Sequence, residues 1–348
     1  MVTELGPGRE FDLIRGFLDR GGAAPGPAVR VGPGDDCTVV TGEGVAVTAD
    51  MVVEDVHFRR GWLAPGEIGY HAAMAALSDL AAMAARPIGV LASVALGPGD
   101  EDGFGSDLMA GLAEAAADAG ATLLGGDVTR SSGPLVVDVV AVGDAPRPVL
   151  RTGARPGHEV WVTGRLGAAA AAVSAWLAGG EPDPDARTPF ARPTARIREA
   201  LWLHERSVPA AMVDLSDGIA GDAAHLAAAN SVRLVIRAAD LPVAEAAARA
   251  DTGADAGVAT GAATGVDAAD GPAPGPPGLR LAAAGGEDYE LCFTAPVGAV
   301  ALVEEAFVER FGIPLTRVGR VEEGEGAVVV DGDGTPLELE GFQHWGAS

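Results

Sequence analysis

Residues 76–83 read Ala-Leu-Ser-Asp-Leu-Ala-Ala-Met, and they place a single carboxylate, Asp79, inside an apolar segment. The surrounding residues 67–85 are rich in Ala and end just before Arg86-Pro87, which predicts a long helix. Because such a helix would be largely buried, an unpaired charge within it would be costly. We therefore expect a cation beside Asp79, which could be Arg86, another Arg or a metal ion.

The segments around this helix show alternating strand and helix patterns. Strands are predicted at 44–53, 88–96 and 135–142, and helices at 10–20 and 101–119. Together with residues 67–85 they form a mixed α+β unit of about one domain's length.

The remaining sequence predicts a second α+β unit. Pro and Gly concentrate at 143–156, so we expect two domains, 1–146 and 147–348. After a strand at 160–164, the order helix, helix, strand, helix, strand is expected as far as residue 236. Residues 245–278 are of low complexity, and we expect a mobile surface insertion there. Further elements are a strand at 291–294, a helix at 297–311 and a hairpin at 328–339.

The composition excludes several classes of function. All 24 basic residues are Arg, and the formal net charge is −25. Without Lys, Schiff-base chemistry, a Walker-A loop and the protein-kinase strand lysine are excluded. The acidic balance argues against nucleic-acid duplexes and anionic membranes as partners. Two distant cysteines and no apolar leader indicate a soluble, cytoplasmic protein without an anchor.

Asp residues recur beside Gly or hydroxyl residues along the chain. Taken singly, each such motif is typical of a turn or a helix cap. Several carboxylates with a hydroxyl are also the oxygen ligands that Mg²⁺ prefers, and substrate phosphates usually complete such sites. An Asp–Arg structural pair remains the alternative for Asp79. The motifs, in order, are Gly34-Asp35-Asp36, Thr48-Ala49-Asp50, Ser78-Asp79, Gly125-Gly126-Asp127 and Asp214-Leu215-Ser216-Asp217-Gly218.

Together with His57-Phe58 and Gly285-Gly286-Glu287-Asp288-Tyr289-Glu290-Leu291, these motifs closely resemble the thiamine-monophosphate kinase family. That family shares a superfamily with aminoimidazole-ribotide synthase, selenophosphate synthetase and a hydrogenase maturation protein. The resemblance extends from residue 10 to residue 344, apart from 245–278. It implies a two-domain α+β fold like that of aminoimidazole-ribotide synthase, and a homodimer formed through the N-terminal domain.

The resemblance also implies a reaction, the last step of thiamine diphosphate biosynthesis. ATP would donate its γ-phosphoryl group directly, in line, to the phosphate of thiamine monophosphate, with several Mg²⁺ ions. The acceptor is already an anion, so no strong base is needed to deprotonate it. What the protein must supply is charge neutralisation and alignment of two polyanions.

The family's functional positions carry over onto individual residues of this sequence. Metal ligation is implied for Asp36, Thr48, Asp50, Asp79, Asp127, Asp214 and Asp217. Asp214 and Asp217 are also implied to be catalytic, with Asp217 binding a further ion near the transferred group. ATP contacts are implied for Gly126, Asp127, Arg151 and Ser216, and substrate contacts for His57, Glu287 and Phe342. The sequence departs from relatives in having Ala at 49, which offers no hydroxyl, and Phe at 342, which can stack but cannot donate a hydrogen bond.

Alternatives remain open at this point. Selenophosphate synthetase would need a reactive Cys or selenocysteine and a Lys, and the hydrogenase maturation protein should end in Cys rather than Gly346-Ala347-Ser348. An enzyme like aminoimidazole-ribotide synthase and a non-catalytic nucleotide or metal sensor are the two competing functions. For single residues, His57 could be an exposed polar side chain, and Arg151 could be a linker residue paired with a carboxylate.

Overall fold

The computed structural model describes residues 29–31, 38–40, 44–98, 100, 102–252, 277–339 and 341. The predicted helix at 10–20 and the functional predictions for Asp36 and Phe342 lie outside these residues.

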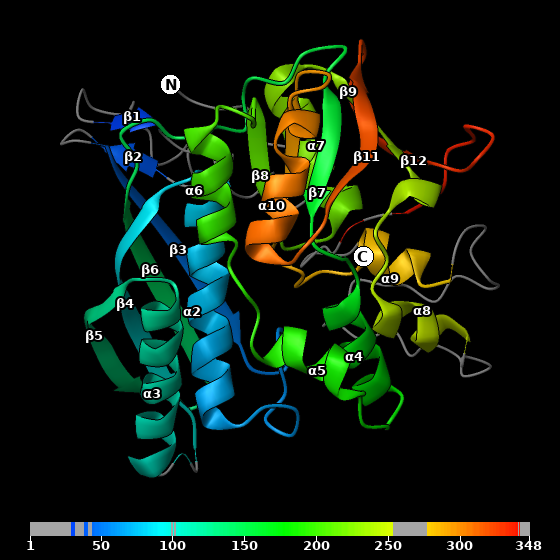
Figure 1. The fold of residues 1–348 in the computed structure, drawn as a ribbon. Helices are drawn as coiled ribbons and strands as arrows, with labels where there is room; N and C mark the ends of the chain where they lie inside the picture. Colours follow the sequence, from blue (N-terminus) through cyan, green and yellow to red (C-terminus); the bar gives the residue numbers. More distant parts are fainter. Residues whose placement is uncertain are drawn as a thin grey trace.

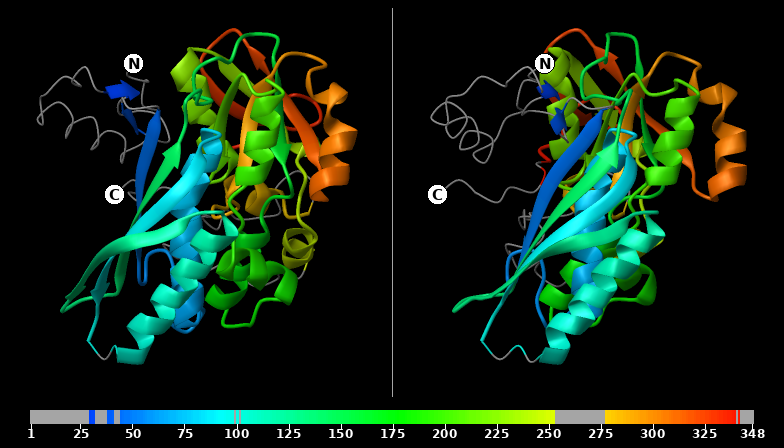
Figure 2. Two further views of the ribbon diagram at one scale, coloured as in Figure 1. Left: turned by 60° about the vertical axis from the view of Figure 1, so that its left-hand side comes forward. Right: turned by 90° about the vertical axis from the view of Figure 1, so that its left-hand side faces the viewer.

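The first half of the chain forms a six-stranded sheet in the order β1-β2-β3-β6-β4-β5 (Figure 1). Neighbouring strands are antiparallel except β4 and β5, which are parallel. Helices α2 (Pro65–Ala82) and α3 (Asp102–Asp118) pack on one face of this sheet (Figure 2). The strands are β1 (Val29–Val31), β2 (Thr38–Val40), β3 (Val45–Val53), β4 (Arg86–Leu96), β5 (Thr122–Arg130) and β6 (Val136–Asp144).

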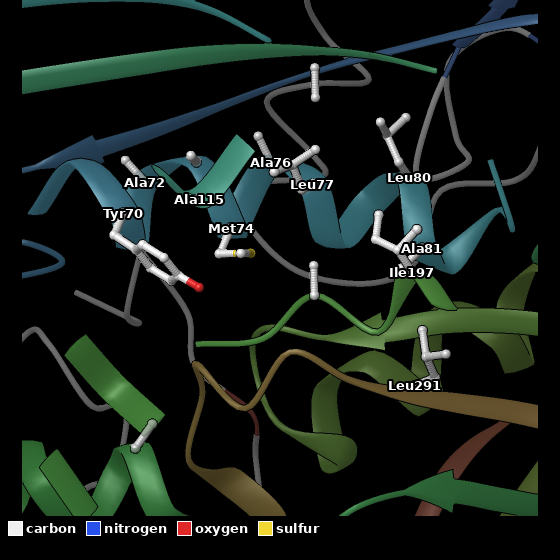
Figure 3. Packing of buried hydrophobic residues seen from close by; sticks show 14 of the residues in the cluster. Tyr70, Ala72, Met74, Ala76, Leu77, Leu80, Ala81, Ala115, Ile197 and Leu291 are labelled. Carbon is white, nitrogen blue, oxygen red and sulfur yellow. The ribbon is translucent and has the colours of Figure 1, made fainter. Parts of the chain in front are cut away.

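Helix α2 is the central element of the molecule. Pro65 starts it, and Glu67 accepts a hydrogen bond from the backbone N–H of Ala64 at 2.9 Å, which caps the first turn. It ends where Ala84 adopts a positive φ of 49°. Figure 3 shows α2 between the first sheet and residues Ile197 and Leu291 of the second half. The helix is therefore buried on nearly all sides, as the Ala-rich sequence predicts.

The second half forms another six-stranded sheet, in the order β12-β9-β11-β7-β10-β8. Only the β12–β9 pair is parallel. Its strands are β7 (Glu159–Thr163), β8 (Ala211–Leu215), β9 (Arg233–Arg237), β10 (Glu290–Ala295), β11 (Leu315–Glu322) and β12 (Gly326–Val330). Its helices are α4 (Ala168–Leu177), α5 (Pro184–Ala191), α6 (Ile197–Glu205), α7 (Ile219–Asn230), α8 (Glu245–Thr252), α9 (Leu279–Ala284) and α10 (Glu304–Phe311), with 3₁₀ turns at Ala238–Asp240 and Val300–Leu302.

The α+β fold class is confirmed, with corrections to single elements. Three helices, not two, lie between β7 and β8. Residues 245–252 belong to α8, whose Ala246 and Ala247 are buried in the core, so the predicted insertion began too early. Small Ala side chains pack there although their composition looks like low complexity. The domain boundary at 146/147 stays a prediction. No described helix has the length and apolar character needed to cross a bilayer.

Candidate functional site

Two of the predicted ligands meet between the first sheet and α2. Thr48 lies on β3 with its side chain buried, and its hydroxyl donates a hydrogen bond to Oδ2 of Asp79 at 2.5 Å. Asp50 is two residues further along the same strand, so its side chain is on the same side of the sheet as that of Thr48. The helix thus brings the carboxylate of Asp79 to the sheet, beside a hydroxyl.

Asp50 lies in a negative environment. Loss of solvent around this side chain, and next the charge of Glu287, together raise its pKa to about 6. Glu287 belongs to the second half of the chain, so the two halves contribute acidic groups to one region. A bound cation would relieve this repulsion and favour the ionised carboxylate.

Two loops of the second sheet form the other wall of this region. The backbone N–H of Glu287 donates to the carbonyl of Ser216 at 2.8 Å, and that of Tyr289 donates to the carbonyl of Leu215 at 2.8 Å. A Cβ at Gly286 would lie 2.4 Å from the Ser216 carbonyl oxygen. The sequence needs glycine here because the two loops pack backbone against backbone.

Glu287 is held by two side chains. Its Oε2 lies 2.8 Å from Nε2 of His71 and accepts a hydrogen bond from the Tyr289 hydroxyl at 2.7 Å. Burial acts to raise the pKa of Glu287, but the His71 charge and both contacts outweigh it, so the pKa is lowered. Glu287 and Tyr289 have positive φ values of 70° and 50°, a strained backbone that clusters at functional sites.

A second acidic cluster lies where β8 runs into α7. Ligand atoms of Asp217, Asp222 and His225 are all within 4.8 Å of one another. Burial, and then the charges of Asp217 and Asp214, raise the pKa of Asp222 well above its usual value. The Asp222 carboxylate accepts a hydrogen bond from the Asp217 backbone at 3.1 Å.

Arg151 acts on this cluster through its charge, which lowers the pKa of Asp222. Asn230, at the end of α7, fixes the Arg151 segment in place. Its amide donates to the Arg151 carbonyl at 2.8 Å, and its Oδ1 accepts from the N–H groups of Gly153 and Ala154 at 2.6 and 2.9 Å.

Gly126 and Asp127 lie within β5, at the edge of the first sheet. Gly126 has a φ of +155°, and a Cβ there would lie 1.8 Å from the Ala92 carbonyl oxygen. Asp127 is exposed. Gly126 therefore allows β4 and β5 to approach closely, and leaves the following carboxylate open to solvent.

Comparison with known proteins gives a consistent picture. Residues 34–145 match the family model described as AIR synthase related protein, N-terminal domain. A thiamine-monophosphate kinase from Mycobacterium tuberculosis is 33% identical over 97% of this chain and 90% of its own length. The chain belongs to the thiamine-monophosphate kinase family. A structure described as AaThiL complexed with AMPPCP and TMP is 28% identical, with a TM-score of 0.76 over 97% of each chain. The kinase from Stenotrophomonas maltophilia K279a is 30% identical, with a TM-score of 0.70 over 94% of this chain and 96% of its own.

Most of the residues predicted from the family motifs can be placed in the structure. It joins Thr48 to Asp79 and brings the charges of Asp50 and Glu287 within range of each other. It also gathers Asp214 and Asp217 around Asp222, with Ser216 bonded to the Glu287 backbone. His57 follows β3, accepts a hydrogen bond at Nδ1 from the Val53 N–H at 3.0 Å, and acts on Glu287 through its charge. The metal, ATP and substrate roles of these residues stay predictions.

Three residues of this kinase-family chain were missed from its sequence: His71, Asp222 and His225. His71 could have been found by the argument used for Asp79, since it is a polar group in the same apolar helix. Asp222 and His225 are three residues apart on α7 and so share one face of the helix, immediately after the Asp214–Gly218 motif.

Proposed function

We propose that this protein transfers the γ-phosphoryl group of ATP to the phosphate of thiamine monophosphate, giving thiamine diphosphate and ADP. The observation that carries the proposal is the full-length similarity to thiamine-monophosphate kinases. The acidic region shared by the two halves of the chain supports it, because the reaction needs charge neutralisation more than it needs a base.

Mg²⁺ fits the residues that face this region. Their donors are carboxylate and hydroxyl oxygens, and the chain contains no Lys that could neutralise them instead. Asp50, Thr48 and Asp79 would hold ions on the first sheet, and Asp214 and Asp217 on the second. When bound, Mg²⁺ would offset the phosphate charges and orient the transferred group.

The nucleotide side of the site would combine both halves. Arg151, whose backbone carbonyl accepts a hydrogen bond from Asn230, would contact the ATP phosphates. Because the chain contains no Lys, an Arg has to supply the positive charge there. Ser216 would contribute to nucleotide binding from the loop after β8, and Gly126 and Asp127 from β5. On the acceptor side, His57, Glu287 and Phe342 would bind thiamine monophosphate.

A homodimer through the first sheet is part of the same proposal. The face of the sheet turned away from α2 carries exposed apolar side chains, among them Met51 and Leu91, which are 50% and 37% exposed. Met51 and Leu91 point away from α2, since Asp50 and Ala92 face it. Apolar side chains clustered in this way are typical of an interface. Sedimentation should show a dimer, and Leu91→Arg should shift it towards the monomer.

We also propose a cytoplasmic location. The chain has only two cysteines, far apart in sequence, and Cys292 is a free, buried thiol. Free thiols are typical of a reducing compartment such as the cytoplasm.

A coupled assay for ADP release tests the proposed reaction. Thiamine monophosphate should support ADP release in the presence of Mg²⁺, and thiamine diphosphate should appear in equal amount. Thiamine and the precursors of aminoimidazole ribotide serve as controls and should give background rates. ADP release that depends on one of those controls instead would contradict the kinase assignment, and the absence of turnover with every acceptor would favour a sensor.

A further inference from the structure

His71 is a buried titratable side chain that the reaction outlined above does not use. It lies on α2, in the first half of the chain, and is 1% exposed. Its ring packs against Phe190 of α5 at a centroid distance of 5.1 Å and meets Tyr289 edge-on at 6.0 Å. These aromatic rings keep water away from the imidazole.

Both ring nitrogens of His71 lie close to oxygen atoms. Nδ1 lies 2.7 Å from the Phe190 carbonyl oxygen, within hydrogen-bond geometry, and Nε2 lies 2.8 Å from Oε2 of Glu287, at ion-pair distance but outside hydrogen-bond geometry. The imidazolium has an N–H for the carbonyl and a positive charge for the carboxylate, whereas a neutral imidazole has one N–H and no charge. Phe190 is in the last turn of α5, where carbonyls lack helical partners and the helix dipole favours a cation.

The contacts of Glu287 are one-sided. Its Oε2 receives both the His71 ion pair and the Tyr289 hydroxyl. Among the described residues, its other oxygen, Oε1, takes part in no hydrogen bond or ion pair, and the side chain is 19% exposed. His71 and Tyr289 thus leave one defined oxygen for a ligand.

We propose that His71 is a positioning residue of the acceptor half of the site: held between the Phe190 carbonyl and Glu287, its imidazolium fixes the Glu287 carboxylate with Oε1 directed to the acceptor substrate. This proposal deepens the kinase function and rests on it for the identity of the acceptor. The contact also joins α2 to the 285–291 loop, so it sets how the two halves meet at the site.

The first test is independent of turnover. In the full-length protein with ¹⁵N-labelled histidine, NMR reports which ring nitrogens are protonated, and His71→Gln identifies the signal by removing it. At pH 7 both nitrogens of His71 should carry protons, although a free imidazole titrates near 6.5. Glu287→Gln should move the titration of His71 to lower pH, with Asp50 as the remaining nearby acid. A neutral single tautomer in the wild type would overturn the proposal.

The second test uses steady-state kinetics. His71→Gln should raise the KM for thiamine monophosphate roughly tenfold or more, with little change in the KM for ATP. His71→Lys should restore much of the loss because it keeps the charge. In a Glu287→Gln background the His71→Gln change should add little, as expected for two residues acting as a unit. His204→Gln on α6 is the matched control.

Separate results identify which idea fails. Wild-type protein that releases no ADP with thiamine monophosphate contradicts the proposed function. The NMR measurement still tests whether His71 is an imidazolium in that case. Active wild-type protein whose His71→Gln variant keeps the wild-type KM, or whose loss is equal for ATP and for the acceptor, overturns the positioning role alone. Circular dichroism and thermal melting of each variant separate these results from misfolding.

Discussion

The site has a closed half and an open half, and they differ in how much of their geometry one chain can fix. Around Glu287 and Asp222, loops from the second sheet hold the acidic groups through backbone hydrogen bonds and buried contacts. On β5, Asp127 is exposed at the edge of the first sheet. The closed half is therefore fixed by contacts within the chain, whereas the carboxylate of Asp127 in the open half is exposed to solvent.

The largest effect should come from the carboxylate that lies between the two sheets. Asp79→Asn should lower kcat by roughly 100-fold or more while the fold is kept, since Asn fills the same volume and still accepts from Thr48 but binds metal poorly. Asp144→Asn, exposed at the end of β6, is the control and should be close to wild type. Full activity and an unchanged Mg²⁺ requirement in Asp79→Asn would show that Asp79 is only structural.

Two adjacent glycines test the open half. Gly126→Ala should destabilise the protein by about 1–3 kcal/mol more than Gly125→Ala, because a Cβ at 126 overlaps the Ala92 carbonyl, while one at 125 meets nothing within 4 Å. Both positions have positive φ, so both variants carry similar backbone strain. The difference between their free energies of unfolding therefore reports the overlap with the Ala92 carbonyl alone. Urea unfolding measures it. Equal losses of stability in the two variants would mean that β4 and β5 can move apart.

Sequence reasoning identified Asp79 as a carboxylate that needs a partner in an apolar helix. The structure places the Thr48 hydroxyl beside it, and the expected cation stays a prediction. The close backbone packing of Gly286 was not predicted, because Gly-Gly also begins ordinary turns. Reasoning failed at α8, where buried Ala residues resemble low complexity, and at His71, whose partners are 119 and 216 residues away along the chain. The polar side chain in an apolar helix was a local signal for His71, but its long-range partners leave no local pattern.

The closed half should also respond to pH. The raised pKa of His71 gives stability that is present below its unfolded value near 6.5 and is lost as the pH rises through the folded value. The lowered pKa of Glu287 gives stability that is present above about 4.5 and is lost as the pH falls. The free energy of unfolding of wild type minus that of His71→Gln should therefore be largest between these limits, at about 1–3 kcal/mol. A difference that stays constant from pH 4 to pH 9 would contradict an ion pair.

The smallest effect on catalysis is expected from deletions in the low-complexity segment. Deleting 253–276 should leave kcat and KM nearly unchanged. Deleting 245–276 should additionally lower the melting temperature, because Ala246 and Ala247 of α8 pack in the core. Comparing the two deletions separates packing from catalysis. A folded but inactive 253–276 deletion would show that this segment takes part in the site.

The most direct measurement is a crystal structure with Mn²⁺ in place of Mg²⁺, a non-hydrolysable ATP analogue and thiamine monophosphate, with the metals located by anomalous scattering. We predict ions held by Asp50, Asp79 and Asp127 from the first sheet and by Asp214 or Asp217 from the second, lying between the two phosphorylated ligands. Ions that bind only at isolated surface carboxylates, with the two ligands apart, would contradict the account.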